Sequence, residues 1–259
     1  MKERIDILLV ERRLVESRTK AQWLIRNGHV LVNGIKINKP GKKVDNNCLI
    51  ELKKQFPYVG IGGLKLEAAL KSFSIDVKNK VCADIGASIG GFTDCLLKRG
   101  ALKVYAVDTA TDLLHPSLKC NETRVVKLLG IDARKLTSMD EEIDLVTIDI
   151  TFTSLKNILI NVKNYLSKNG DIIALIKPIF ESTPQDQKKF KIIKDPLILR
   201  DIIINLIEWC HENGLYTHDV IKSPILGKKG SIEFLIHLKL YPSKKELDLE
   251  KKIRSIIIT

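Results

Sequence analysis

Four ionisable residues that are far apart in the sequence stand where a sheet would bring them together. Asp149 lies at the end of LVTIDI and Lys177 at the end of ALIKP. Both are therefore expected beyond the carboxyl ends of strands, where open parallel sheets bind ligands. Glu233 starts the last apolar run, and Lys65 lies on a first helical turn, where a cation opposes the helix dipole. Two lysines and two carboxylates at one edge favour catalysis by proton transfer, although each alone has the alternative of a capping Asp or a surface Lys.

A second candidate site is the small-residue loop in VCADIGASIGG, residues 81–91, between an apolar strand and a helix-like run. Small residues let the backbone approach a ligand, and the helix start presents N–H groups. The next strand ends in Asp108 without a phosphate-binding lysine, which suits a ligand with an ammonium group and a ribose diol, such as S-adenosylmethionine. The alternative is a tight turn with no ligand. The candidate cofactor residues of the loop are Asp84, Gly86, Ala87, Ser88, Gly90, Gly91 and Phe92.

The residues after the fourth strand bear on the methyl acceptor. An exocyclic amine acceptor favours an Asn/Asp-Pro-Pro-aromatic loop, whereas Asp149 is followed by Ile-Thr-Phe, and C5 methylation of cytosine needs a cysteine nucleophile, which is missing near this strand. A hydroxyl acceptor is therefore favoured. Because a hydroxyl is a poor nucleophile, Lys177 is predicted to take its proton, with Asp149 and Glu233 orienting the two lysines.

Alternating strands and helices are needed to position these residues. The pattern predicts a mainly parallel α/β sheet of the Rossmann-like class, and the short connection SPILGKKGS predicts a final hairpin with an antiparallel last strand. The predicted strands cover residues 81–84, 103–107, 124–128, 145–149, 171–176, 216–221 and 232–240, and the predicted helices cover residues 63–75, 92–99, 155–166 and 197–213.

The first 54 residues have a different character. They hold 13 Lys and Arg against 6 Asp and Glu, which leaves about +5 of the net +12 for the other 205 residues. A polyanionic partner is therefore expected, with a basic membrane-binding surface as the alternative. The pattern predicts a short helix, a second helix capped by Ser17 and ended by Gly28, a hairpin around Asn33-Gly34 and a strand over 48–52.

Composition excludes several classes of protein. With 44% hydrophobic residues and no apolar run near 18 residues, the chain is predicted to be globular and not to span a membrane. The charged opening MKERIDILLV predicts no export and a cytoplasmic location. Scattered cysteines without a C-x-x-C pair predict reduced thiols and no metal site; they are Cys48, Cys82, Cys95, Cys120 and Cys210.

Two resemblances follow from motifs in order. SRTKAQWLI, GHVLVNG and KPGKKV resemble the S4-type RNA-binding domain, which is a small α+β domain. That resemblance implies a phosphate-gripping face made of Arg4, Arg18, Lys20, Arg26 and Lys36. Behind it, GGLKLEAAL, DIGASIGGFTDCLL, VYAVD, IDITF, LIKPIFE and GSIEFLIHL resemble the TlyA family, also called hemolysin A-like, whose catalytic half is similar to the FtsJ ribose methyltransferases.

The TlyA resemblance implies a seven-stranded class I methyltransferase sheet and S-adenosylmethionine-dependent 2′-O-methylation of cytidine in ribosomal RNA. It implies a Lys-Asp-Lys-Glu tetrad made of Lys65, Asp149, Lys177 and Glu233. It also implies ribose contacts from Asp108 and an adenine contact from Asp132. The expected organisation is an RNA-binding domain over 1–54, a linker over 55–62, a catalytic domain over 63–242 and a tail over 243–259 whose helicity stays open. The alternatives are a membrane-lytic protein and an RNA-binding module without catalysis.

Overall fold

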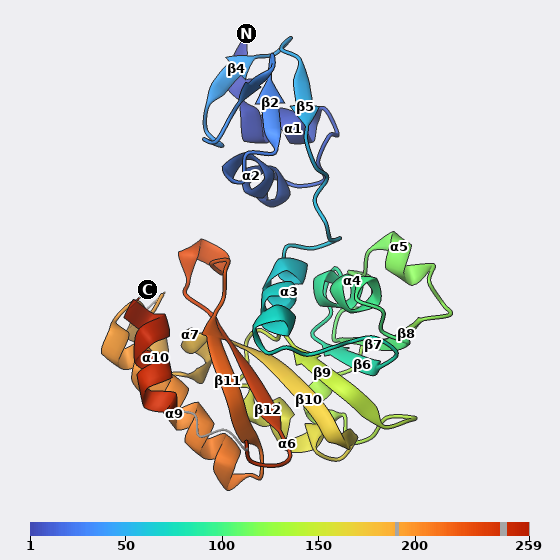
Figure 1. Ribbon diagram of the computed structural model, residues 1–259, viewed down its shortest axis with the longest axis vertical. Helices are drawn as coiled ribbons and strands as arrows, with labels where there is room; N and C mark the ends of the chain where they lie inside the picture. Colours follow the sequence, from blue (N-terminus) through green and yellow to red (C-terminus); the bar gives the residue numbers. More distant parts are fainter. Residues whose placement is uncertain (190–191, 244–247, 259) are drawn as a thin grey trace. The chain divides into compact units, whose positions relative to one another are not determined.

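The chain folds into two compact units, Met1–Ile61 and Gly62–Thr259. The computed structural model describes residues 1–189, 192–243 and 248–258 (Figure 1). Within these ranges, no helix combines the length and the apolar character that a membrane crossing requires.

The first unit is a small α+β domain whose local signals behave as predicted. The Ser17 hydroxyl accepts from the Lys20 N–H at the start of α2, and Asn33 and Gly34 both take the positive φ of a hairpin turn. The apolar faces of the two helices pack on the strands to form one core. The elements are β1 (Lys2–Arg4), α1 (Ile5–Glu11), α2 (Arg18–Arg26), β2 (Val30–Val32), β3 (Ile35–Lys36), β4 (Lys43–Asp45) and β5 (Ile50–Leu52).

Two strands of this unit were not predicted. β1 pairs with β4 in a separate antiparallel ribbon, beside the three-stranded sheet β3-β2-β5. Each of the two strands has only three residues, and Val44 is the one buried apolar side chain among them. They therefore lack the apolar alternation that announces a strand.

The second unit is built on a seven-stranded sheet in the order β11-β12-β10-β9-β6-β7-β8. All pairs from β10 to β8 are parallel, whereas β12 is antiparallel to both β10 and β11. This confirms the predicted fold class and the final hairpin. The strands are β6 (Val81–Ile85), β7 (Lys103–Asp108), β8 (Val125–Leu129), β9 (Ile143–Ile148), β10 (Leu166–Ile176), β11 (Tyr216–Lys222) and β12 (Phe234–Lys239).

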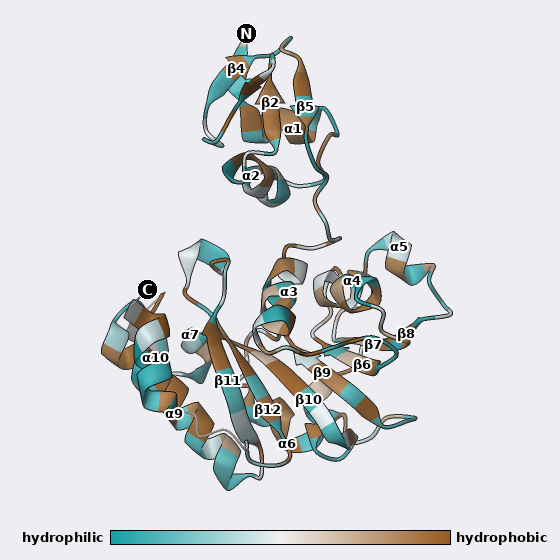
Figure 2. Cartoon of the chain, in the orientation of Figure 1, coloured by the Kyte–Doolittle hydropathy of each residue, from teal (hydrophilic) through white to brown (hydrophobic). Residues whose placement is uncertain are grey.

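Helices cover both faces of this sheet (Figure 1). Alternate residues of β6 face opposite ways, so Ala83 and Ile85 join the core under α6 and α9 while Asp84 faces α4. In Figure 2 the middle strands are largely hydrophobic. The helices are α3 (Gly62–Ser72), α4 (Gly91–Lys98), α5 (Pro116–Lys119), η1 (Ala133–Lys135), α6 (Lys156–Val162), α7 (Pro178–Glu181), α8 (Pro184–Lys189), α9 (Pro196–Glu212), η2 (Lys228–Gly230) and α10 (Leu249–Ile258).

One predicted helix was too long. The helix expected over 155–166 ends at Val162, and β10 already begins at Leu166, with a register shift against β9 before Asp171. The polar stretch LSKNG carries no apolar alternation, so its strand character depends on pairing with a neighbour rather than on local pattern.

The helix α10 settles the question that the sequence left open for the tail. Its residues Ile253 and Ile257 are buried in the core that also holds α9, and the Lys252 ammonium lies 3.0 Å from an Asp219 oxygen on β11. The described part of the tail is thus an amphipathic helix that packs on the second unit.

Candidate active site

The four predicted catalytic residues meet at one edge of the sheet as two ion pairs. Lys65 Nζ lies 2.6 Å from Glu233 Oε2, and Lys177 Nζ lies 2.5 Å from Asp149 Oδ1. Lys177 also donates to the Ile150 carbonyl at 2.7 Å. The structure therefore brings together side chains that are up to 168 positions apart in the chain.

The sheet topology accounts for this meeting. Asp149 and Lys177 each follow the last residue of the neighbouring parallel strands β9 and β10. Because Phe234 pairs with Ile176, the preceding Glu233 lies at the same edge. An added Cβ at Gly62, at the start of α3, would lie 3.9 Å from Asp149 Oδ2, so the helix that carries Lys65 begins beside that carboxylate.

Three of these four side chains are almost excluded from solvent. The exposed fractions are 9% for Lys65, 5% for Glu233 and 13% for Lys177, against 24% for Asp149. In a low-dielectric site, removing one member of an ion pair leaves a buried charge without compensation. The pairs thus fix the positions of both ammonium groups, and Asp149 is the member most open to a ligand.

Asp84 has a different place from the one the sequence suggested. It is fully buried, and its Oδ2 accepts from the Thr93 N–H at 2.8 Å and the Thr93 hydroxyl at 2.7 Å, while Oδ1 accepts from the Thr147 hydroxyl. The carboxylate therefore ties β6 to α4 and β9 beneath the loop and does not line open space. We assign it a role in holding the loop's shape instead of a direct cofactor contact.

Burial raises the pKa of Asp84 to about 7. Since the folded-state pKa lies above the unfolded value near 4, the stabilisation from the protonated carboxyl is complete below about pH 4 and is lost as the pH rises through about 7. We expect the free energy of unfolding to fall by about 4 kcal/mol over that range relative to Asp84→Asn, at about 1.4 kcal/mol per pKa unit. Urea unfolding of both proteins from pH 4 to 8.5 tests this, and parallel curves would contradict it.

The rest of the loop has the features of a ligand cradle. Gly86 and Gly90 take φ of +85° and +96°, and Ser88 also has a positive φ. Asp108 accepts the Ser88 N–H at 2.7 Å and the Ala110 N–H at 2.8 Å, which leaves lone pairs on both oxygens for a diol. The start of α4 supplies N–H groups. These residues fit the ribose and amino-acid ends of S-adenosylmethionine.

The remaining predicted cofactor residues surround this loop. Ala87, Gly91 and Phe92 are buried, and Phe92 packs close to Gly62. Asp132 is bound by Arg134, whose guanidinium lies 2.7 Å from Oδ2 and lowers the pKa of that carboxyl to about 2. Asp132 is therefore ionised over the physiological range, and an adenine amine would share it with Arg134. Among the described residues, no group of three His, Cys, Asp or Glu could hold a metal ion.

Two aromatic residues at this edge were not predicted. Phe152, three residues after Asp149, is 88% exposed and has a φ of +70°, and its ring centroid lies 5.9 Å from that of Phe180, three residues after Lys177. An exposed aromatic ring close in sequence to the Asp149 carboxylate offers a stacking face for a nucleobase. Both phenylalanines lie three residues after a predicted site residue, and this equal spacing was the signal available in the sequence. The exposure and the φ of Phe152 depend on the fold and could not be seen there.

The five predicted RNA contacts separate into three groups. Arg4 and Arg18 meet at the start of α2, where both guanidinium groups bind the buried Asp6, at 2.9 and 3.2 Å. Arg26 and Lys36 lie at the other end of the helix and are exposed. Lys20 is buried, paired with Glu16 and placed over the Phe56 ring. The structure thus places Lys20 apart from the other four predicted RNA contacts, in an internal pair with Glu16.

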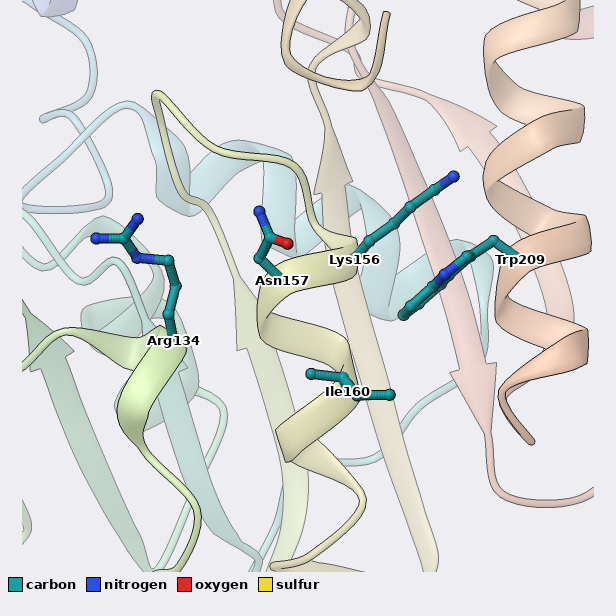
Figure 3. A pocket seen from close by; sticks show the side chains of 5 residues that line it. All are labelled: Arg134, Lys156, Asn157, Ile160 and Trp209. Carbon is teal, nitrogen blue, oxygen red and sulfur yellow. The ribbon is translucent and has the colours of Figure 1, made fainter.

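A separate cavity of about 670 Å³ lies between η1, α6 and α9 (Figure 3). None of the four residues of the two ion pairs lines this cavity, so it is distinct from the predicted catalytic site. Lys156 Nζ lies over the Trp209 ring, 5.8 Å from the ring centroid. The cavity is lined by Arg134, Lys156, Asn157, Ile160 and Trp209.

The sheet order, the antiparallel β12, the glycine-containing loop and the carboxylates beyond the parallel strands define a class I methyltransferase. The fold agrees with a solved S-adenosylmethionine-dependent methyltransferase from Mesorhizobium loti, with a TM-score of 0.52 at 15% identity over 69% of this chain and 99% of that chain. This likeness concerns the fold alone.

Comparison with known sequences gives the family. Residues 58–240 match the FtsJ-like methyltransferase family and residues 3–47 match the S4 domain. The chain is 41% identical to YqxC of Bacillus subtilis, over 92% of this chain and 85% of that protein, and 38% identical to Hemolysin A of Brachyspira hyodysenteriae, over 90% and 98%. A solved structure of a protein named as a hemolysin from Streptococcus thermophilus has a TM-score of 0.72 at 32% identity, covering 99% of this chain and 94% of that one.

The chain therefore belongs to the FtsJ-like methyltransferase family, in its TlyA group, with an S4 domain in front of the methyltransferase domain. The Mycobacterium tuberculosis relative, 34% identical over 91% of this chain and 89% of that protein, is named 16S/23S rRNA (cytidine-2′-O)-methyltransferase TlyA. This confirms the family resemblance seen in the sequence.

Proposed function

We propose that this protein transfers a methyl group from S-adenosylmethionine to the 2′-oxygen of a cytidine in ribosomal RNA. The observation that carries the proposal is the presence of two ion pairs at the carboxyl ends of the parallel strands, the buried pair of Lys65 with Glu233 and the partly buried pair of Lys177 with Asp149. Family membership and the name of the tuberculosis relative support the substrate and the acceptor atom.

The proposed chemistry uses the residues as placed. When bound, S-adenosylmethionine supplies an electrophilic methyl group and leaves as a neutral thioether. Lys177 Nζ accepts the proton of the attacking 2′-hydroxyl. The resulting ammonium is held by Asp149 Oδ1 at 2.5 Å and the Ile150 carbonyl at 2.7 Å. Lys65, fixed by Glu233, adds positive charge near the oxygen that loses its proton.

We further propose that Phe152 provides the stacking face for the target base. It is the most exposed large apolar side chain of the second unit among the described residues and follows the catalytic carboxylate by three positions. Sequence-specific RNA recognition uses unstacked bases laid on aromatic rings, and each such contact contributes about 1–3 kcal/mol. The ring and Lys177 would thereby hold the base and the ribose of one nucleotide.

The direct test is methyl transfer to separated ribosomal subunits with tritiated S-adenosylmethionine, followed by nuclease digestion and mass spectrometry. Label on a cytidine 2′-oxygen, absent with Lys177→Ala, is expected. No label on either subunit together with no cofactor binding by titration calorimetry would favour an RNA-binding module. Leakage of lipid vesicles by the protein would favour the lytic alternative.

The S4 unit should contribute affinity through phosphate contacts. We expect Arg18→Ala to weaken subunit binding about three- to tenfold at 100 mM salt and to reduce the slope of log K against log salt by about 1. Arg18 is 54% exposed and oriented by Asp6, so its guanidinium is presented to a ligand. Filter binding over a salt series measures this. Lys168→Ala, at the opposite edge of the sheet, is the matched charge control, and equal effects of the two variants would contradict the assignment.

A further inference from the structure

Residues 177–181 contact residues 149–155 at three successive points. Lys177 holds Asp149 and the Ile150 carbonyl, Phe180 lies against Phe152, and Glu181 holds the far end. The Glu181 contacts are short: Oε1 accepts from the Leu155 N–H at 2.7 Å and Oε2 accepts from the Ser154 hydroxyl at 2.5 Å. Two stretches of five and seven residues therefore run against each other along the catalytic edge.

A glutamate at position 181 has an unfavourable desolvation free energy, which only its contacts with the neighbouring segment offset. Burial raises the pKa of its carboxyl, and the two hydrogen bonds from the neighbouring segment only partly oppose that effect. A leucine or glutamine at the same position would avoid most of the desolvation. Burial of the Glu181 carboxylate is therefore unfavourable by itself. Its hydrogen bonds hold the Ser154 hydroxyl and the Leu155 N–H immediately before α6.

The loop between the Lys177 contacts and the Glu181 contacts contains Phe152, whose backbone is strained. Phe152 has a φ of +70°, in the left-handed region that costs a residue with a Cβ roughly 1–2 kcal/mol, and its side chain is 88% exposed. Such a conformation persists only where the surroundings hold it. Lys177 secures the loop's beginning and Glu181 secures its end, so the ring is kept pointing outward instead of collapsing onto the sheet.

We propose that Glu181 is a positioning residue for RNA binding, which acts by holding the 149–155 loop so that Phe152 is presented to the substrate base. This proposal rests on the proposed function, because it assumes that Phe152 meets a nucleobase. It assigns to the end of the LIKPIFE segment a task distinct from the proton transfer of Lys177. The carboxylate binds the Leu155 N–H and the Ser154 hydroxyl, so its proposed effect on RNA passes through the loop.

The first test measures the loop itself and does not depend on the reaction. Hydrogen exchange of a peptide covering 150–156 is expected to be at least tenfold faster in Glu181→Ala than in the natural protein. Glu181→Gln should exchange close to normally, because its amide oxygen can accept from the Leu155 N–H and its amide N–H can donate to the Ser154 hydroxyl oxygen. Unchanged exchange in Glu181→Ala would overturn the proposal, whatever RNA the enzyme modifies.

The second test asks whether the loop acts through Phe152. Glu181→Ala should raise KM for the RNA about tenfold with the S-adenosylmethionine Kd unchanged, and Glu181→Gln should restore it. In a double-mutant cycle, Glu181→Ala added to Phe152→Ala should cause little further loss. Additive losses, or a cofactor Kd that rises in step, would overturn the proposal. Absence of any methyl transfer by the natural protein would instead contradict the proposed function.

Asp171→Asn is the matched control for a buried carboxylate. Asp171 lies at the opposite edge of the sheet and accepts from His237 at 2.8 Å, Lys239 at 2.7 Å and Lys80 at 2.9 Å. Its replacement should lower the melting temperature without changing KM for RNA or exchange of the 150–156 peptide. A KM change as large as that of Glu181→Ala would show that general destabilisation explains both.

Discussion

Replacing Lys177 by alanine should reduce methyl transfer at least 1000-fold while leaving the affinity for S-adenosylmethionine within about threefold of normal. The Lys177 ammonium lies 2.5 Å from Asp149 and 2.7 Å from the Ile150 carbonyl, and 13% of the side chain is exposed. Its loss removes the proposed proton acceptor and leaves Asp149 unpaired. General base removal alone typically costs about 10²–10⁴ in rate.

Single-turnover methylation and titration calorimetry would separate chemistry from cofactor binding. Lys80→Ala is the matched control, since Lys80 is likewise paired with a carboxylate, that of Asp171 at 2.9 Å, but lies at the amino ends of the strands. It should lower stability and spare the rate. Near-normal turnover by Lys177→Ala with cofactor bound would exclude Lys177 as the base and would direct attention to Asp149.

The strand-end positions show how much of such a site a sequence can predict. Asp149 and Lys177 were recognisable because each ends an apolar run, and in a parallel sheet such ends share one edge. Glu233 required one further inference, that the last strand runs antiparallel, and the short SPILGKKGS connection supplied it. These predictions depend on periodicity and chain length, which are local properties of the sequence.

Other features depend on tertiary contacts and could not be predicted in this way. Asp84 and Lys20 have the residue types of ligand contacts. Asp84 is nevertheless buried between α4 and β9, and Lys20 pairs with Glu16 and lies over the Phe56 ring. Part of each environment comes from a distant segment, Thr147 for Asp84 and Phe56 for Lys20, so residue type does not distinguish a structural charge from a functional one. The exposure of Phe152 and the hydrogen bonds of Glu181 likewise depend on tertiary structure.

The position of Glu233 depends in turn on a glycine. A Cβ added at Gly227 would lie 1.9 Å from Glu233 Oε1 and 2.5 Å from the Ser231 hydroxyl oxygen. Gly227 has a φ of −73°, which any residue adopts, so its requirement comes from the space it leaves and not from backbone freedom. Its N–H donates to the Ser231 carbonyl at 2.8 Å, which closes the turn that leads to Glu233.

Gly227→Ala is therefore expected to lower kcat about 100-fold by displacing the Glu233 carboxylate from Lys65, with which it forms a 2.6 Å ion pair. Both side chains are more than nine-tenths buried, so the displaced carboxylate has no equivalent position close by. Steady-state kinetics with saturating S-adenosylmethionine would measure the effect. The cofactor Kd should stay unchanged, because the contact lies at Glu233 and not at the 84–91 loop.

The same turn provides a control of opposite character. Gly230 has a φ of +82°, and an added Cβ there meets nothing within 4 Å. Gly230→Ala should therefore destabilise the protein by about 1 kcal/mol through backbone strain and keep kcat within about threefold. If the two variants lose activity equally, the flexibility of the turn and not the space beside Glu233 governs catalysis. A selective loss in Gly227→Ala would instead show that the Lys65 and Glu233 pair has to be held at its present distance.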